Sequence, residues 1–101
     1  MTYDFKTLTE RLHTLLEEGH FSIVPLARER LERNGLKAPQ VYHAIVTGKP
    51  HPCREPDRVK FISDTAIVFV AIGHGYGDRI KLEHGFVCAA YRNYTPEVLT
   101  A

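Results

Sequence analysis

The chain has 101 residues, a length that fits one domain with a single hydrophobic core. Its 44% hydrophobic content excludes intrinsic disorder, and its formal net charge of +1 gives no indication of nucleic-acid binding from overall charge. Any basic surface must therefore come from local clustering of cations.

Three amphipathic patterns at helical spacing fill the first half of the chain, at residues 5–16, 22–33 and 39–47. Each is followed within a few residues by a glycine, which commonly ends a helix in the left-handed conformation. Prolines near the start of the second and third patterns are compatible with a first helical turn, where a missing N–H costs little. We therefore expect three short helices within residues 4–48.

A proline-rich segment, residues 49–57, follows the helical half. It contains Pro50, Pro52 and Pro56, which exclude a helix and any central strand. The segment is therefore expected to be an extended connector at which the chain changes from helices to strands.

Residues 58–94 show strand-like alternation and many β-branched side chains. Four strands are expected at residues 58–62, 65–72, 79–82 and 86–91, joined by turns at Ser63-Asp64 and His84-Gly85 and by a glycine-rich loop at Gly73–Asp78. The second is expected to be a central strand covered on both faces, and the first an exposed edge strand available to a second copy. Because short connections make neighbouring strands antiparallel, the sequence predicts one α+β domain over residues 1–101, with three short N-terminal helices packed on a four-stranded antiparallel sheet.

The second helical pattern, Leu26–Leu36, resembles a pattern of small bacterial domains that runs His-Ala-x-Glu-Arg-Met-x-Glu-Arg-Gly-Ile. Ala27, Glu29, Arg30 and Gly35 match it, whereas Leu26 stands where the pattern has histidine. The order of elements over residues 22–92 is also similar to that of the RelE/BrnT-like toxin superfamily, although the strand that usually precedes the helices there is not evident. The resemblance implies metal-independent RNA cleavage by Arg, Lys, His or Tyr side chains on the sheet.

Seven residues are candidates for such chemistry. Cleavage of RNA without a metal needs an acid and a base for the leaving oxygen and the 2′-hydroxyl, and cations for the developing phosphorane charge. The candidates are Arg58, Arg79, Lys81, Tyr91, Arg92, His43 and His84. Basic residues that alternate with apolar ones are also typical of any half-exposed strand, so a charged outer surface without chemistry is the alternative.

A zinc site or a disulfide is a further alternative in the sheet half. His51, Cys53, His84 and Cys88 together supply two nitrogens and two sulfurs, although Cys88 lies in an apolar run typical of a buried thiol. Cys53 and Cys88 also allow one disulfide. Neither is the favoured interpretation, and no metal or cofactor is expected. His13 is expected to be a surface residue.

The favoured function is a toxin-like domain of a bacterial toxin system that binds or cleaves RNA and is neutralised by a cognate antitoxin or another protein. The alternative is a non-enzymatic interaction module, an immunity or adaptor protein, which the near-neutral charge favours. Residues 1–5 lack the features of a secretion signal, and the longest apolar run, Ala66–Ile72, is too short to cross a bilayer. We therefore expect a cytoplasmic protein without a membrane partner, as a monomer or homodimer.

Overall fold

The computed structural model describes residues 3–77 and 80–93, which form three helices and one five-stranded sheet. In chain order the elements are α1 (Phe5–Glu17), β1 (Phe21–Ile23), α2 (Pro25–Arg33), α3 (Ala38–Thr47), β2 (Lys49–Pro52), β3 (Arg58–Ile62), β4 (Ala66–Gly77) and β5 (Ile80–Arg92). The strand order is β1-β5-β4-β3-β2, with β1 parallel to β5 and the other neighbouring pairs antiparallel. The expected α+β class is confirmed, but the described sheet is mixed and has five strands instead of four antiparallel ones.

The sequence prediction misses both outer strands of this sheet. β1 has only three residues, too few to show a period, and it ends two residues before Pro25 opens α2. β2 lies inside the proline-rich connector, at the edge of the sheet, where a missing N–H is tolerated. Because β2 and β4 flank β3 on its two sides, the prediction that Arg58–Ile62 is an exposed edge strand is wrong.

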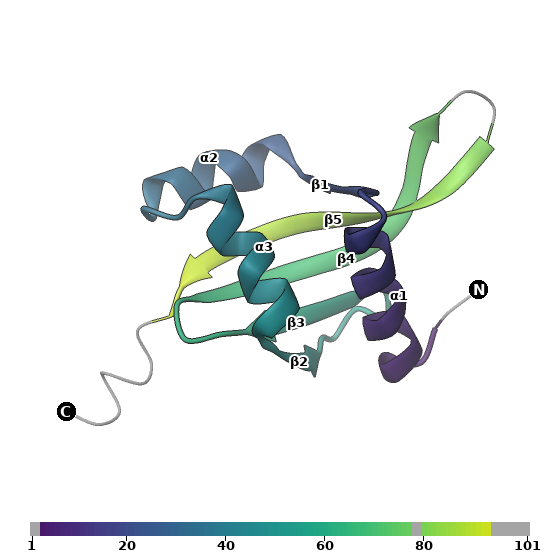
Figure 1. The fold of residues 1–101 in the computed structure, drawn as a ribbon, viewed down its shortest axis with the longest axis horizontal. Coiled ribbons are helices and arrows are strands. Elements are labelled where there is room, and N and C mark those ends of the chain that lie inside the picture. Colours follow the sequence, from purple (N-terminus) through teal and green to yellow (C-terminus); the bar gives the residue numbers. More distant parts are fainter. Residues whose placement is uncertain (1–2, 78–79, 94–101) are drawn as a thin grey trace.

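Two predicted connections in the sheet half are also wrong. β4 continues through Gly73 to Gly77, where a loop was expected, and Asp78 lies outside the described residues. β5 runs unbroken through His84 and Gly85, where a turn was expected. The result is one long β4–β5 hairpin that extends beyond the helices (Figure 1).

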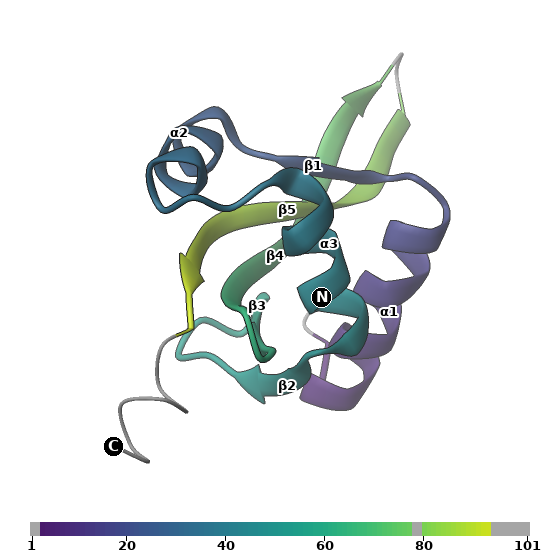
Figure 2. The ribbon, with the colours of Figure 1, turned by 60° about the vertical axis from the view of Figure 1, so that its left-hand side comes forward.

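All three helices pack on the same face of the sheet (Figures 1 and 2). Every second residue of the inner strands points into the core beneath them, among them Val59 and Phe61 of β3 and Val68 and Val70 of β4, all 0% exposed. The helices contribute a matching set of fully or almost fully buried side chains, Leu8, Leu12, Leu15, Ala27, Leu31, Val41, Ala44 and Ile45. The opposite face of the sheet is left without a helix among the described residues, so the prediction that the central strand is covered on both faces is not met there.

Local signals place α1 and α3 as the sequence predicts, whereas α2 begins at Pro25 and not at residue 22, because Phe21–Ile23 form β1. The Asp4 carboxylate accepts a hydrogen bond from the Thr7 amide at 2.7 Å and caps α1. Gly35 ends the α2 turn at a φ of 73°, which favours glycine. His13, expected at the surface, is instead half-buried, because its Nε2 lies 2.8 Å from the Ile45 carbonyl and its ring packs against Phe61.

Candidate nucleic-acid interface

The helix-free face of the sheet carries the side chains that alternate with the core. The register places Lys60 of β3 opposite Phe69 of β4, and Phe69 opposite Ala89 of β5. One step along the strands, Ile67 lies between Ile62 and Tyr91. Because successive strand residues point to opposite faces, these side chains share the face that the helices leave uncovered.

A cation and two aromatic rings form a row across this face. The Lys60 ammonium lies 6.0 Å from the centroid of the Phe69 ring, within the range of a cation–π contact. Phe69 and Tyr91 meet edge to face, with centroids 6.2 Å apart and planes at 85°. Tyr91 is 43% exposed, so its ring is accessible from solvent. The row therefore presents ring surface beside a positive charge.

The charges of the described strands are unevenly divided. Their basic residues are Lys49, Arg58, Lys60, Lys81 and Arg92, whereas Glu83 is their one acidic residue. Glu83 is engaged on the helical side, where Arg11 Nε of α1 donates to it at 2.6 Å and the Tyr3 hydroxyl also donates to it. Within the described part of the chain, no acidic strand residue therefore opposes Lys60 and Arg58 on the helix-free face. The net charge of +1 for the whole chain does not reveal this local excess of positive charge.

Arg58, at the start of β3, lies beside an irregularity in the sheet. The register of β4 and β5 shifts between Phe69 and Val70, so Cys88 is an extra residue in β5. Burial raises the pKa of the Cys88 thiol, and the positive charge of Arg58 partly opposes that shift. The Arg58 Nε is buried and has no hydrogen-bond partner among the described residues. Arg58 is two residues from Lys60 on the same strand, so it adds a second cation to the helix-free face.

The two cysteines are free thiols, so the disulfide considered from the sequence is not formed. Burial also raises the pKa of Cys53. Within the described residues there is no group of three or more His, Cys, Asp or Glu side chains that could hold a metal ion. The four residues considered as a zinc set are therefore not brought together.

His84 lies on the helix-free face near the end of the sheet where β1 joins β5. Its Nε2 lies 2.7 Å from the Ser22 hydroxyl of β1, and its ring packs against Phe86 with centroids 4.8 Å apart. Burial and, secondarily, the neighbouring His20 lower the pKa of His84 below its ordinary value of 6.5. The imidazole is therefore neutral at pH 7.

The lowered pKa of His84 predicts a pH-dependent stability. Between its folded pKa and the ordinary value of 6.5, the unfolded chain binds a proton that the folded chain does not. The contribution of His84 is therefore fully present above about pH 6.5 and is lost as pH falls from that value through the lowered folded pKa. Urea unfolding at intervals from pH 8 to pH 5 should show a decline that is shallower in His84→Gln. Parallel curves for the two proteins would contradict this assignment.

The other predicted site residues lie elsewhere. Arg92 reaches the helical side, where its guanidinium approaches Gly35 after α2, and it pairs in register with the buried Ala66. Lys81 pairs with Tyr76 in the hairpin, and its side chain, like all of Arg79, lies outside the described part. His43 is an exposed residue of α3. Of the seven candidates, the structure places Arg58, His84 and Tyr91 on the helix-free face. The described candidates therefore do not lie together in one site.

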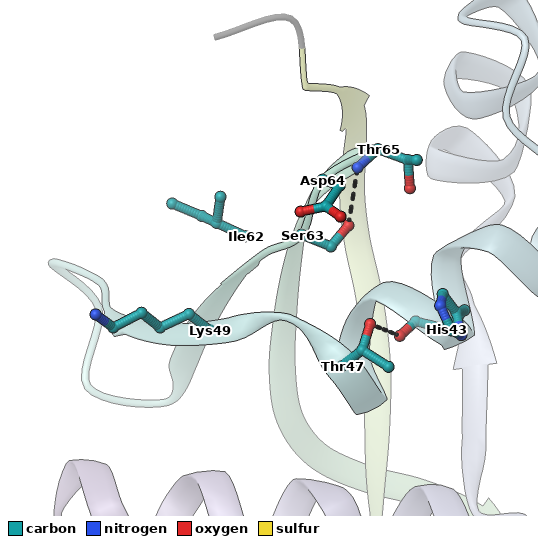
Figure 3. A pocket seen from close by; sticks show the side chains of 7 residues that line it. All are labelled: His43, Thr47, Lys49, Ile62, Ser63, Asp64 and Thr65. Atoms are coloured by element: carbon teal, nitrogen blue, oxygen red, sulfur yellow. Dashed lines mark hydrogen bonds between the residues drawn. The ribbon is translucent and has the colours of Figure 1, made fainter. Parts of the chain in front are cut away.

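His43 borders a pocket of about 370 Å³ at the end of α3 (Figure 3). The pocket is lined by His43, Thr47, Lys49, Ile62, Ser63, Asp64 and Thr65. Two of its hydroxyls are engaged with the backbone, since Thr47 donates to the His43 carbonyl and Ser63 accepts from the amides of Thr65 and Ala66. These contacts stabilise the helix end and the β3–β4 turn, so the sheet face is the stronger candidate site.

The sequence prediction overlooks Phe69 and Ser22 as members of a site. Phe69 lies in an apolar run that the sequence assigns to a doubly covered strand, and the run does not reveal which face is open. Ser22 lies in the short strand that the prediction misses. The alternation in Arg58-Val-Lys60-Phe-Ile62 is the one local signal that indicated an outward basic face.

No helix in the described part of the chain is long and apolar enough to cross a membrane. No family model, no curated protein and no solved structure matches the chain. The arrangement of the side chains themselves is therefore the basis for a functional proposal.

Proposed function

We propose that this protein is a toxin-like domain that binds single-stranded RNA on the helix-free face of its sheet. The observation that carries the proposal is the row Lys60–Phe69–Tyr91 on a face without an opposing acidic strand residue. Bases of single-stranded RNA stack on aromatic side chains, at about 1–3 kcal/mol per base, while cations contact the phosphates. Lys60 and Arg58 supply those cations beside the rings.

The order of elements from β1 to β5 also supports this proposal. RelE/BrnT-like toxins usually have a strand before two helices, and in this chain β1 (Phe21–Ile23), which the sequence did not reveal, precedes α2 and α3. The chain from β1 onward therefore has a strand, two helices and then further strands, as that resemblance implies. A bacterial toxin system, with a protein that neutralises the domain, is the context we propose for it.

Binding is favoured over cleavage by the spacing of the candidate acids and bases. His84 and Tyr91 are seven residues apart on β5, which corresponds to roughly 20 Å along a strand. One phosphodiester cannot contact both. The described residues of the face can thus hold RNA, whereas they do not assemble an acid, a base and a cation around one phosphate.

The test is fluorescence anisotropy with a labelled single-stranded RNA of about ten nucleotides, with a duplex of the same sequence as comparison. Tyr91→Ala should weaken binding roughly tenfold, the equivalent of about 1.4 kcal/mol for one lost stacking contact. Lys60→Gln should also weaken it and should reduce its dependence on salt. Lys6→Gln removes an exposed charge from α1 and serves as the matched control with unchanged affinity.

Equal affinity of the Tyr91→Ala, Lys60→Gln and parent proteins would rule out this face as the RNA site. The same samples, run on a denaturing gel, test cleavage directly. Discrete products that disappear in Tyr91→Phe would extend the proposal from binding to catalysis, and intact RNA would limit it to binding.

A second candidate is a protein-interaction module, which one observation favours. Next to the aromatic row the helix-free face is aliphatic, with Ile62 and Ile67 half-buried beside Tyr91. Apolar surface of this kind also suits a protein partner. Binding of a partner protein that is insensitive to salt and to Lys60→Gln, in the absence of RNA binding, would favour this function.

A further inference from the structure

Ser22 and His84 meet although they are 62 residues apart in the chain. β1 pairs in parallel with β5 and places Phe21 opposite Gly85 and Ser22 opposite Phe86. Ser22 therefore lies diagonally across from His84 on the helix-free face, where its Oγ is 2.7 Å from Nε2. This is the contact that a serine nucleophile needs with its general base.

The imidazole is held in place and is in the reactive charge state. Phe86 packs against the His84 ring at 4.8 Å, and this contact restricts its rotation. Burial and His20 keep the ring neutral at pH 7, so an unprotonated nitrogen is present. In the tautomer with its proton on Nδ1, Nε2 accepts the hydrogen bond from the Ser22 hydroxyl.

The surroundings favour a neutral substrate. The neighbouring titratable group that lowers the pKa of His84 is His20, and no described Arg or Lys contributes to this shift. Within the described residues a phosphodiester would therefore find no counter-charge beside His84, whereas the carbonyl of an ester needs none. Ser22 is half-buried on an edge strand, so a small molecule can approach it from the side of the sheet that β1 borders.

We propose that Ser22 and His84 form a nucleophile–base pair that accepts acyl groups from small activated esters. Ser22 Oγ forms a bond to the carbonyl carbon while its proton passes to His84 Nε2. The bond from that carbon to the alcohol oxygen then breaks, and the alcohol leaves with the proton from His84. Water hydrolyses the acyl-serine, with His84 as base again, and releases the carboxylic acid.

A fluorophosphonate probe tests the pair directly. Ser22 Oγ would form a bond to phosphorus, fluoride would leave, and the hydroxyl proton would remain on His84. Intact-mass and peptide mass spectrometry of the full chain should show one label, on Ser22. Ser22→Ala should abolish it, and His84→Gln should slow it about a hundredfold, the usual loss on removal of a general base.

The chain provides its own control, because it contains only one other serine, Ser63. The Ser63 hydroxyl donates to the Ala66 carbonyl and has no imidazole partner among the described residues, so Ser63→Ala should label like the parent protein. Circular dichroism of each variant establishes that it is folded. Mapping of the label in the parent protein needs no variant, so the test stands even if one variant is unstable.

Two outcomes would overturn the proposal. One is the absence of label in the parent protein at a probe concentration that fully labels a serine protease. The other is a label that persists in Ser22→Ala. Neither outcome affects RNA binding by Lys60, Phe69 and Tyr91, which lie on other parts of the face.

Discussion

Phe61→Ala should lower the free energy of unfolding by about 3–5 kcal/mol, the usual cost of deleting a buried phenyl ring. Phe61 is 0% exposed, lies in the inner strand β3 and packs against His13 of α1. The cavity would open between the sheet and the helices, where neither layer can collapse freely. A domain of this size has about 5–15 kcal/mol of total stability, so the loss is a large fraction. Urea unfolding followed by circular dichroism measures it.

Phe69→Ala is the matched control, because it removes the same ring from the neighbouring strand β4 on the opposite face. Phe69 is half-buried and contacts Lys60 and Tyr91 rather than the helices. We expect a much smaller loss of stability, together with weaker RNA binding. Similar losses of stability in the two variants would contradict the division of the sheet into a core face and an open face.

Gly85→Ala should destabilise the domain by about 1–3 kcal/mol through steric overlap. A Cβ added at Gly85 would lie 2.1 Å from Cε2 of Phe21, the residue opposite it in β1. The Phe21 ring also packs edge to face on Tyr42 of α3, with centroids 6.3 Å apart, so it has little freedom to move away. The expected consequence is loss of the β1–β5 pairing, measured as a lower unfolding midpoint.

A double-mutant cycle separates this overlap from other effects of the substitution. Phe21→Ala removes the ring that the new methyl group meets, so Gly85→Ala should cost much less in that background. The expected coupling is about 0.5–3 kcal/mol, typical of residues in contact. Additive losses would show that Gly85 is required for a reason other than the close approach of Phe21.

The helical half of the fold is predictable from sequence because its signals are local. A cap at Asp4, leucines at helical spacing and a glycine stop at Gly35 act within a few residues of one another. The sheet half is less predictable because its partners are distant in sequence. Gly85 suggests a turn when considered alone, yet in the structure it accommodates Phe21, a residue 64 positions earlier.

Prediction of the candidate site from sequence is limited for the same reason, since part of the site depends on residues that are distant in the chain. The alternation around Lys60 correctly indicated an outward basic face, and Tyr91 is on it. Arg92, its neighbour in the chain, points to the helical side because successive strand residues alternate. The contact between Ser22 and His84 depends on a parallel pairing that no local pattern encodes.

The two prolines of β2 have a consequence for behaviour at high protein concentration. β2 is the outer strand of the sheet on one side, and two of its four residues, Pro50 and Pro52, have no N–H to offer to a further strand. An incoming chain that tried to lengthen the sheet there would leave carbonyl groups without matching donors. The prolines thus make this edge a poor template for fibril growth, and Pro50→Thr combined with Pro52→Thr would restore the donors and make the protein more prone to aggregate.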